Sequence, residues 1–405
     1  MGSKQSLMVV VQRYGDGVAG GAETLAREVV RRLAPHYDVE VVTTTALDYW
    51  TWEHVLTPGE DRVDGVPVRR FKVEAGRARD YRRYERAAFS AGRTLTDEHA
   101  FVEKQGPYVP ELLEHVHRRG RDVDLALFFG YLYYPTAYGL PLAPERAVHV
   151  PTAHDEPALR LSIFRALFHA PRAFAFSTEE ERALVHGVFR NSRIPSEIVG
   201  IGIDVPQDRS ADRFRERHGV DGPIFLYVGR IVESKGMREL FEHWARWQDA
   251  SGRRATLVLV GHVEMALPDR SDIRHLGVIP DQDKYDAYEA CIAFCMPSRL
   301  ESLSIVTLEA WACGRPTITP ADSPVLASMG RRAGAGLAYA TAAEFAEVCE
   351  LLSEKPDVRD ALGRSGAAFV ARTYTWPLVV EKYRDLFAEV TARNASRTGG
   401  AVRER

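Results

Sequence analysis

The sequence predicts an α/β protein made of two doubly wound domains, each built on a parallel sheet. The chain has 405 residues, which is too long for one ordinary hydrophobic core and suits two domains. Short apolar runs of about four to six residues recur along the chain, separated by stretches with helical periodicity. This alternation is typical of parallel strands that helices cover on both faces.

The first half contains six apolar runs that we expect to form strands. They lie at residues 7–11, 39–43, 125–129, 148–151, 173–176 and 198–201. Residues 22–34 follow the first run and predict an amphipathic helix with Leu25, Val29, Val30 and Leu33 on one side. Proline and charged residues follow the sixth run, so we expect an N-terminal domain at residues 1–205.

The second half repeats the pattern with five further runs. These lie at residues 224–228, 256–260, 273–276, 293–296 and 317–319, and predict a second domain at residues 206–375. Residues 376–393 predict one last amphipathic helix, and residues 394–405 have the composition of a flexible tail.

The composition narrows the functional classes. The net charge of −3, from 53 basic and 56 acidic residues, gives no global argument for a nucleic-acid partner. No apolar run approaches the ~20 residues that span a bilayer, and the N-terminus leads into a strand rather than a signal peptide. We therefore expect a cytoplasmic protein. The four cysteines are expected to be buried free thiols.

One segment, residues 77–86 with Arg77 and Arg86 at its ends, is rich in arginine and tyrosine and departs from the alternation. As a helix it predicts either a solvated surface covering the first domain, or a surface for a membrane or an acidic partner. We favour the solvated helix because Asp80 and Glu85 dilute the positive charge.

Three loops that follow predicted strands carry residues suited to anions or sugars. Gly20 and Gly21 precede the first helix, where backbone amides can approach a ligand, but the spacing matches neither a dinucleotide fingerprint nor a P-loop. Arg230 and Lys235 follow the strand at 224–228 and together suit a diphosphate. His154 follows another strand end and is a candidate for a site in a crevice.

The segment 301–310, with sequence ESLSIVTLEA, places two carboxylates eight residues apart. Glu301 is expected to precede a helix whose first turn contains residues 302–304, and Glu309 to lie in its second turn. Unpaired amides at a helix N-terminus attract anions, and carboxylates accept hydrogen bonds from sugar hydroxyls. Two other acid pairs, at residues 122–124 and 281–283, are expected to be structural.

Together these motifs resemble the family-four retaining glycosyltransferases, also described as glycosyl transferases group 1, which have the GT-B fold. The pieces that match are Gly20-Gly21-Ala22-Glu23, His154-Asp155, Gly229-Arg230 with Lys235, Val260-Gly261, and Glu301 with Glu309. The resemblance implies two Rossmann-like domains facing each other across a cleft, and a final helix, beginning near Trp376, that packs on the first domain.

The resemblance also implies residue roles. Arg230 and Lys235 would hold the donor diphosphate, Glu309 would bind the ribose, and Glu301 would contact the donor sugar. The remaining donor-binding residues would be Gly20, Gly21, Gly229, Gly261 and the amides of Ser302, Leu303 and Ser304. His154 would lie beside the transferred sugar, so the catalytic set would be His154, Glu301, Arg230 and Lys235. Many members read Glu-Pro-Phe-Gly-Leu, and here Ser304 replaces that glycine.

The activity implied is metal-independent, retaining transfer of a hexose-type sugar from a nucleoside-diphosphate donor, with no cofactor. The acceptor hydroxyl would belong to a glycan, a lipid-linked molecule or a small molecule, and domain closure would assemble the site. Peripheral membrane contact through residues 77–86 stays open. Two alternatives on the same fold are a sugar-nucleotide 2-epimerase and a non-catalytic nucleotide-binding subunit.

Overall fold

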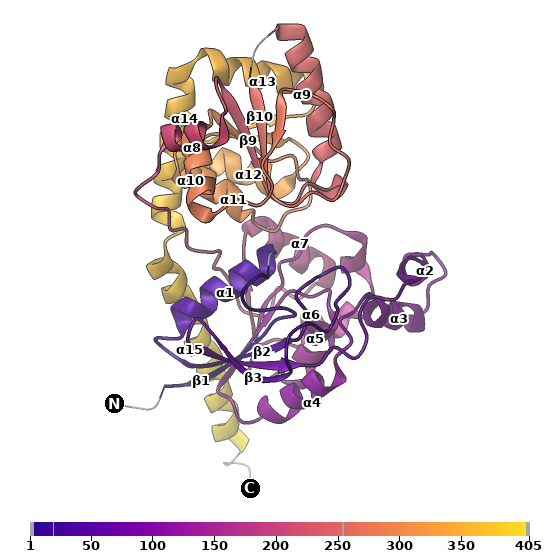
Figure 1. Ribbon diagram of the computed structural model, residues 1–405. Coiled ribbons are helices and arrows are strands. Elements are labelled where there is room, and N and C mark those ends of the chain that lie inside the picture. Colours follow the sequence, from indigo (N-terminus) through magenta and orange to yellow (C-terminus); the bar gives the residue numbers. More distant parts are fainter. Residues whose placement is uncertain (1–3, 19, 253–254, 402–405) are drawn as a thin grey trace. The chain divides into compact units, whose positions relative to one another are not determined.

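The computed structural model describes residues 4–18, 20–252 and 255–401, which fold into two compact units (Figure 1). Unit 1 contains the described residues up to Ile201 together with those from Val379 onward, and unit 2 is Gly202–Leu378. Each unit has its own sheet and its own hydrophobic core.

The sheet of unit 1 has eight strands in the order β3-β4-β2-β1-β5-β6-β7-β8. Seven run parallel to one another: β1 (Ser6–Val10), β2 (Asp38–Thr44), β4 (Val66–Phe71), β5 (Leu125–Phe129), β6 (Ala147–Val150), β7 (Ala173–Phe176) and β8 (Ser196–Ile198). The strand expected at residues 198–201 begins two residues earlier. The sequence did not predict β4 or the antiparallel edge strand β3 (Gly59–Val63) beside it. Charged, exposed residues fill most of β3, so it lacks an apolar run.

The helices of unit 1 cover this sheet and extend from it. α1 (Gly21–Leu33) buries the four apolar residues expected on its inner side. The others are α2 (Tyr81–Ala88), α3 (Leu95–Gln105), α4 (Pro110–Arg119), α5 (Tyr134–Gly139), α6 (Phe164–His169) and α7 (Glu179–Phe189).

The final helix, α15 (Trp376–Ala401), packs on unit 1 as expected. The ring of Phe387 meets Tyr37 edge-on at 5.4 Å, and the Lys382 ammonium donates to the carbonyl of Ile198 at 2.6 Å. The helix continues to Ala401, beyond residue 393 where the sequence pattern ends it.

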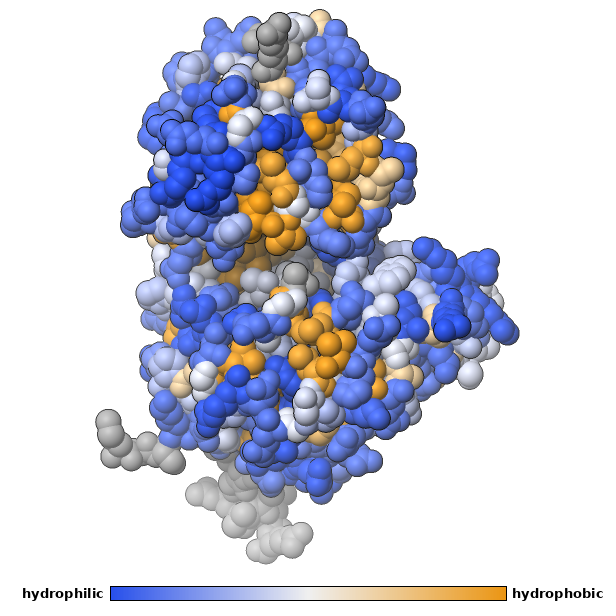
Figure 2. All heavy atoms as spheres, in the orientation of Figure 1, coloured by the Kyte–Doolittle hydropathy of each residue, from blue (hydrophilic) through white to orange (hydrophobic). Residues whose placement is uncertain are grey.

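The arginine-rich helix α2 is a surface helix that packs on α3. Tyr81 and Phe89 contact the buried ring of Phe101, with centroids 5.9 and 5.3 Å away. Four arginines are exposed, at positions 79, 82, 83 and 86, and Figure 2 shows mainly hydrophilic residues over this part of the molecule, on the right of the view. Within the described residues, no helix is long and apolar enough to cross a bilayer.

The sheet of unit 2 has six parallel strands in the order β11-β10-β9-β12-β13-β14, the order of doubly wound dinucleotide-binding sheets. They are β9 (Ile224–Val228), β10 (Thr256–Val260), β11 (Ile273–His275), β12 (Ala293–Cys295), β13 (Thr317–Pro320) and β14 (Gly336–Tyr339). The sequence predicted the first five. It missed β14, a short edge strand that is only partly buried.

Seven α-helices are assigned to unit 2 among its described residues: α8 (Ala211–His218), α9 (Met237–Ser251), α10 (Asp281–Ala290), α11 (Ile305–Ala312), α12 (Pro324–Ala333), α13 (Ala342–Glu354) and α14 (Pro356–Thr373). The four cysteines are buried and free, as predicted.

The loops after β9 and β10 touch through two glycines. Gly229 has φ +147° and Gly261 has φ +134°, and a Cβ at Gly261 would overlap the carbonyl oxygen of Gly229. The next residues continue the contact, because the Ile231 amide donates to the His262 carbonyl at 2.8 Å. The glycines therefore let two backbones meet at the carboxyl edge of the sheet.

This contact predicts the effect of one methyl group. Gly261→Ala adds a backbone overlap to an unfavourable φ, whereas Gly219→Ala in the same unit changes only φ, because nothing lies near its Cβ position. We expect Gly219→Ala to lower Tm by about 2–4 °C and Gly261→Ala by clearly more. Differential scanning calorimetry measures both. Equal shifts would show that the backbone contact imposes no constraint.

Candidate functional site

The carboxyl edge of the unit 2 sheet gathers the loops after β9 and β12, which flank the point where the strand order reverses. The loop after β9 holds Lys235 in a short 3-10 turn, Glu233–Lys235. Gly236 follows with φ +75°, and a Cβ there would overlap the Pro297 carbonyl in the loop after β12. These two loops are therefore in direct backbone contact.

Across this contact Lys235 and Glu301 form an ion pair. The Lys235 Nζ lies 2.6 Å from Glu301 Oε1, and the Glu301 side chain is only 11% exposed. From the sequence, the two residues were expected to contact different parts of a donor. The structure brings them together, so that each charge neutralises the other.

The helix that separates the two glutamates begins later than expected. α11 starts at Ile305, so the prediction that Ser302, Leu303 and Ser304 form its first turn is wrong. Ser304 has φ +73°, a left-handed conformation that a right-handed helix cannot contain, and it occupies the N-cap position. Its Oγ bonds the Thr307 hydroxyl at 2.9 Å rather than capping a backbone amide.

The consequence is an open helix N-terminus beside Glu301. The described hydrogen bonds give the amides of residues 305–307 no acceptor, as is usual for the first turn of a helix. Such amides and the helix dipole favour an anion. The amides free to meet an anion at this helix N-terminus are therefore those of residues 305–307 rather than those of a first turn at Ser302–Ser304.

Glu309 lies in the second turn of α11 as expected, but it is held by three donors from α10. Its Oε1 accepts from the Lys284 ammonium at 3.0 Å and the Tyr285 hydroxyl at 3.2 Å, and its Oε2 accepts from the Tyr288 hydroxyl at 3.1 Å. Burial would lower the pKa of Lys284, but the carboxylates of Glu309 and Asp281 raise it overall. A carboxylate has about four acceptor sites, so Glu309 keeps room for one more donor.

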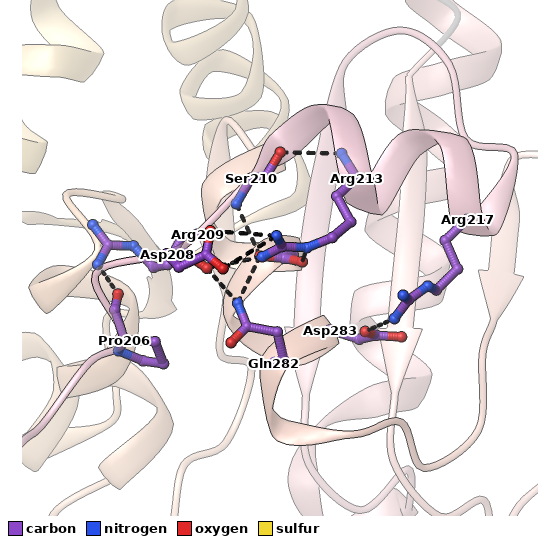
Figure 3. Close-up of polar contacts among 9 residues, drawn as sticks. Pro206, Asp208, Arg209, Ser210, Arg213, Arg217, Gln282 and Asp283 are labelled. Atoms are coloured by element: carbon purple, nitrogen blue, oxygen red, sulfur yellow. Dashed lines mark hydrogen bonds and ion pairs between the residues drawn. The ribbon is translucent and has the colours of Figure 1, made fainter.

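Helix α10 is itself fixed to α8 by buried carboxylates (Figure 3). Asp286 accepts from the Arg213 guanidinium at 2.5 and 2.8 Å and from the Ser210 amide at 2.9 Å. Asp283, also on α10, pairs with Arg217 of α8. The acid pair at 281–283 is therefore structural, as predicted. In unit 1 Asp124 is likewise structural, because it accepts from the Ser6 amide and hydroxyl.

Arg230 projects from the same loop as Lys235. Its Nη1 lies 3.9 Å from Glu264 Oε1, and its side chain is 42% exposed. Its backbone is anchored, because the Tyr227 hydroxyl donates to the Arg230 carbonyl at 2.7 Å. The sequence analysis did not single out Glu264, which follows the neighbouring strand.

In unit 1 the glycine loop carries a buried ion pair. A Cβ at Gly20 would overlap the Glu23 carboxylate, which lies at the N-terminus of α1 beside Gly21. The Arg13 guanidinium neutralises this carboxylate at 2.6 Å, and Gln12 donates to it at 3.0 Å. The position expected to receive a phosphate therefore already holds a compensated negative charge.

His154 lies after β6, and its partner is Glu156 rather than Asp155. His154 Nε2 is 3.5 Å from Glu156 Oε1, and the Tyr131 hydroxyl also donates to Glu156. Burial alone would raise the pKa of Glu156, but His154 and Tyr131 lower it overall. Asp155 is 56% exposed and pairs with Arg160 at 2.5 Å. Spacing along the chain could not distinguish the two acids.

Two doubly wound units and a final helix that packs on the first are the architecture of the GT-B fold. Residues 208–369, almost all of unit 2, match the family model described as "Glycosyl transferases group 1". The predicted resemblance is thus confirmed: unit 2 carries a group 1 glycosyltransferase domain, and glycosyltransferase activity with a nucleotide-sugar donor is supported.

Known proteins resemble the chain over most of its length. A D-inositol 3-phosphate glycosyltransferase from Frankia alni is 26% identical over 391 residues, covering 90% of this chain and 93% of the relative. An O-antigen chain mannosyltransferase B from Escherichia coli is 26% identical over 318 residues, covering 70% and 77%.

Two solved structures share the fold. A sucrose-phosphate synthase from Thermosynechococcus elongatus has a TM-score of 0.67 at 18% identity, covering 96% of this chain and all of that one. Anabaena HepE in complex with UDP-glucose has a TM-score of 0.67 at 14% identity, covering 95% and 99%.

The donors around Glu309 predict a stability difference between two buried tyrosines. Tyr288→Phe removes one donor to a buried carboxylate and should cost about 1–2 kcal/mol. Tyr339→Phe removes a buried hydroxyl oxygen that has no partner in the described structure, so it should cost little. Thermal unfolding of both variants makes the comparison. If Tyr339→Phe were the more destabilising change, the account of Glu309 would be wrong.

Proposed function

We propose that this protein is a retaining hexosyltransferase that moves a hexose-type sugar from a nucleoside-diphosphate donor to an acceptor hydroxyl, without a metal ion. The observation that carries the proposal is the pair of lysine-held glutamates on either side of the α11 N-terminus. Glu301 contacts Lys235 ahead of the helix, and Glu309 contacts Lys284 within it.

The donor diphosphate would bind Arg230, Lys235 and the amides that open α11. A diphosphate would replace Glu301 as the partner of Lys235, which leaves the Glu301 carboxylate able to accept from sugar hydroxyls. The unused acceptor site of Glu309 would accept from the ribose. Gly229 and Gly261 have amides already bonded within the unit, so their role would be to keep the loops close together.

A hexose donor is supported by the names of related proteins. HepE is described in complex with UDP-glucose, and a Corynebacterium glutamicum relative is described as a GDP-mannose-dependent mannosyltransferase. Ser304 stands in the loop where the sugar would lie, and its left-handed backbone keeps the conformation that a glycine there would adopt freely.

In the transfer step, negative charge would develop on the leaving diphosphate. Two cationic side chains and the fixed amides of α11 would stabilise this charge, which is why a metal ion is not required. Glu301 would accept from sugar hydroxyls once the diphosphate has displaced it from Lys235, and we assign it no role as a covalent nucleophile. We therefore propose front-face transfer, in which the leaving phosphate helps to deprotonate the acceptor and His154, oriented by Glu156, lies beside the sugar.

The acceptor is proposed to bind unit 1, with the segment around Arg77 as part of its wall. The Arg77 guanidinium lies over the rings of Trp50 and Tyr81, at 4.4 and 4.8 Å from their centroids, so this surface presents a cation held in place by two aromatic rings. A glycan, lipid-linked or small-molecule acceptor in the cytoplasm fits this surface. The alternative role proposed for this surface is peripheral contact between its exposed arginines and anionic lipid. Vesicle sedimentation would detect that contact.

The donor site predicts stabilisation by a nucleoside diphosphate. Among UDP, GDP and ADP, at least one should raise Tm by about 5 °C when it is present at 100 times its Kd. Arg230→Ala and Glu309→Gln should abolish the shift. Arg238→Ala is the matched control, since that exposed arginine lies at the start of α9 and pairs with Glu233. If no nucleotide stabilised the protein, the donor site would be refuted.

The proposed chemistry predicts that transfer survives metal removal and retains configuration. Turnover of the stabilising nucleotide's hexose donor should be unchanged in EDTA, and proton NMR of the product should show the anomeric configuration of the donor. An inverted product, or loss of activity restored by a divalent cation, would contradict the mechanism. Epimerised donor as the sole product would instead identify a 2-epimerase.

A further inference from the structure

A buried carboxylate, Glu181, ties down the loop that carries His154. It lies in the first turn of α7 with a residue exposure of 1%. Its Oε1 accepts from the Ala153 amide at 2.7 Å, and its Oε2 accepts from the Ser177 amide at 2.6 Å. Ala153 directly precedes His154 and Ser177 follows β7, so one side chain joins the ends of two neighbouring strands.

The backbone at this point needs such a tie. Thr152 has φ +49°, an uncommon conformation for a β-branched residue, so the chain turns sharply just before His154. Ala153 is buried, and Glu181 is the acceptor for its amide. Without that carboxylate, a buried amide would lose its hydrogen bond and the turn would lose its anchor.

Keeping this carboxylate buried costs free energy, which its hydrogen bonds to two backbone amides partly offset. Burial raises the pKa of Glu181 to about 7, although the amides of Ser177 and Ala153 and the nearby His154 act in the opposite direction. Two acceptor oxygens are needed because two amides point at the group. A glutamine would offer one oxygen and would turn its own N–H donors toward the second amide.

We infer that Glu181 is a positioning residue for sugar transfer, acting through the backbone of Ala153 to place His154. The inference rests on the proposed function, in which His154 lies beside the transferred sugar. Glu156, which accepts from Tyr131, contacts the imidazole ring at Nε2, while Glu181 sets the position of the backbone that carries the ring. The two contacts together fix both ends of the side chain.

Unit 1 offers a matched control in Glu98, which is 2% exposed. Its Oε1 accepts from the Arg93 guanidinium at 2.9 Å and its Oε2 from the Ile163 amide at 2.8 Å. It thus resembles Glu181 in burial and in tying a backbone amide, but the amide that it ties is that of Ile163, just before α6 and nine residues beyond His154. Glu98→Gln should therefore lower the stability of the protein, as Glu181→Gln does, while leaving the position of His154 unchanged.

The experiment measures release of nucleoside diphosphate from UDP-glucose or GDP-mannose, whichever nucleotide stabilises the protein. Glu181→Gln should lower kcat by about 10- to 100-fold, because small misplacements of a reacting group have effects of this size. KM for the donor and the nucleotide-induced Tm shift should not change. The double variant with His154→Ala should be no slower than His154→Ala alone, and Glu98→Gln should keep its turnover.

Each other outcome overturns a defined claim. If His154→Ala is impaired while Glu181→Gln is not, or if the two losses multiply, Glu181 does not act through His154 and the proposed function stands. If His154→Ala turns over normally, the role proposed for His154 fails and the inference fails with it. Should Glu181→Gln not fold, Glu181→Asp keeps the charge but cannot span both amides. The same loss and coupling are expected of it, and full turnover would contradict the inference.

Discussion

The carboxyl edge of the unit 2 sheet depends on the contact between Glu309 and three hydrogen-bond donors on α10. A charged carboxylate in a buried position is costly unless it is paired and hydrogen-bonded, and Lys284, Tyr285 and Tyr288 meet both needs. The same contacts fix the distance between α10 and α11. Because α10 is anchored to α8 through Asp283 and Asp286, the orientation of Glu309 also depends on α8, the first helix of unit 2.

A second set of contacts brings the loops after β9 and β12 together. Gly236 passes so close to Pro297 that only a glycine fits, and this approach places Lys235 against Glu301. The pair is self-neutralised in the free protein, so a diphosphate bound as we propose would exchange one anion for another on Lys235. In unit 1, Arg13 and Glu23 form a comparable buried pair at the glycine loop. Charges at these edges are thus compensated before any ligand binds.

Local patterns in the sequence predicted most of the fold, because apolar runs of about four to six residues and helical periodicity depend only on near neighbours. The hairpin of β3 and β4 lies outside that signal, since Asp61 and Arg62 are exposed on an edge strand. The predicted start of α11 was wrong because the left-handed conformation of Ser304 depends on the loop around it. For the candidate site, spacing identified Arg230, Lys235, Glu301 and Glu309 but not what holds them. Lys284 is 25 residues from Glu309, and Glu181 is 28 from Ala153, so only the folded chain shows these contacts.

The central claim is that the lysine-held glutamates around α11 form a donor site, and the most direct measurement is a crystal structure of the protein with its stabilising nucleotide sugar. The account predicts density for the diphosphate between Arg230, Lys235 and the first amides of α11, with the ribose on Glu309. It also predicts that Lys235 moves off Glu301 toward the phosphates. A nucleotide bound elsewhere, or a Lys235–Glu301 contact still at 2.6 Å with no phosphate beside it, would contradict the account.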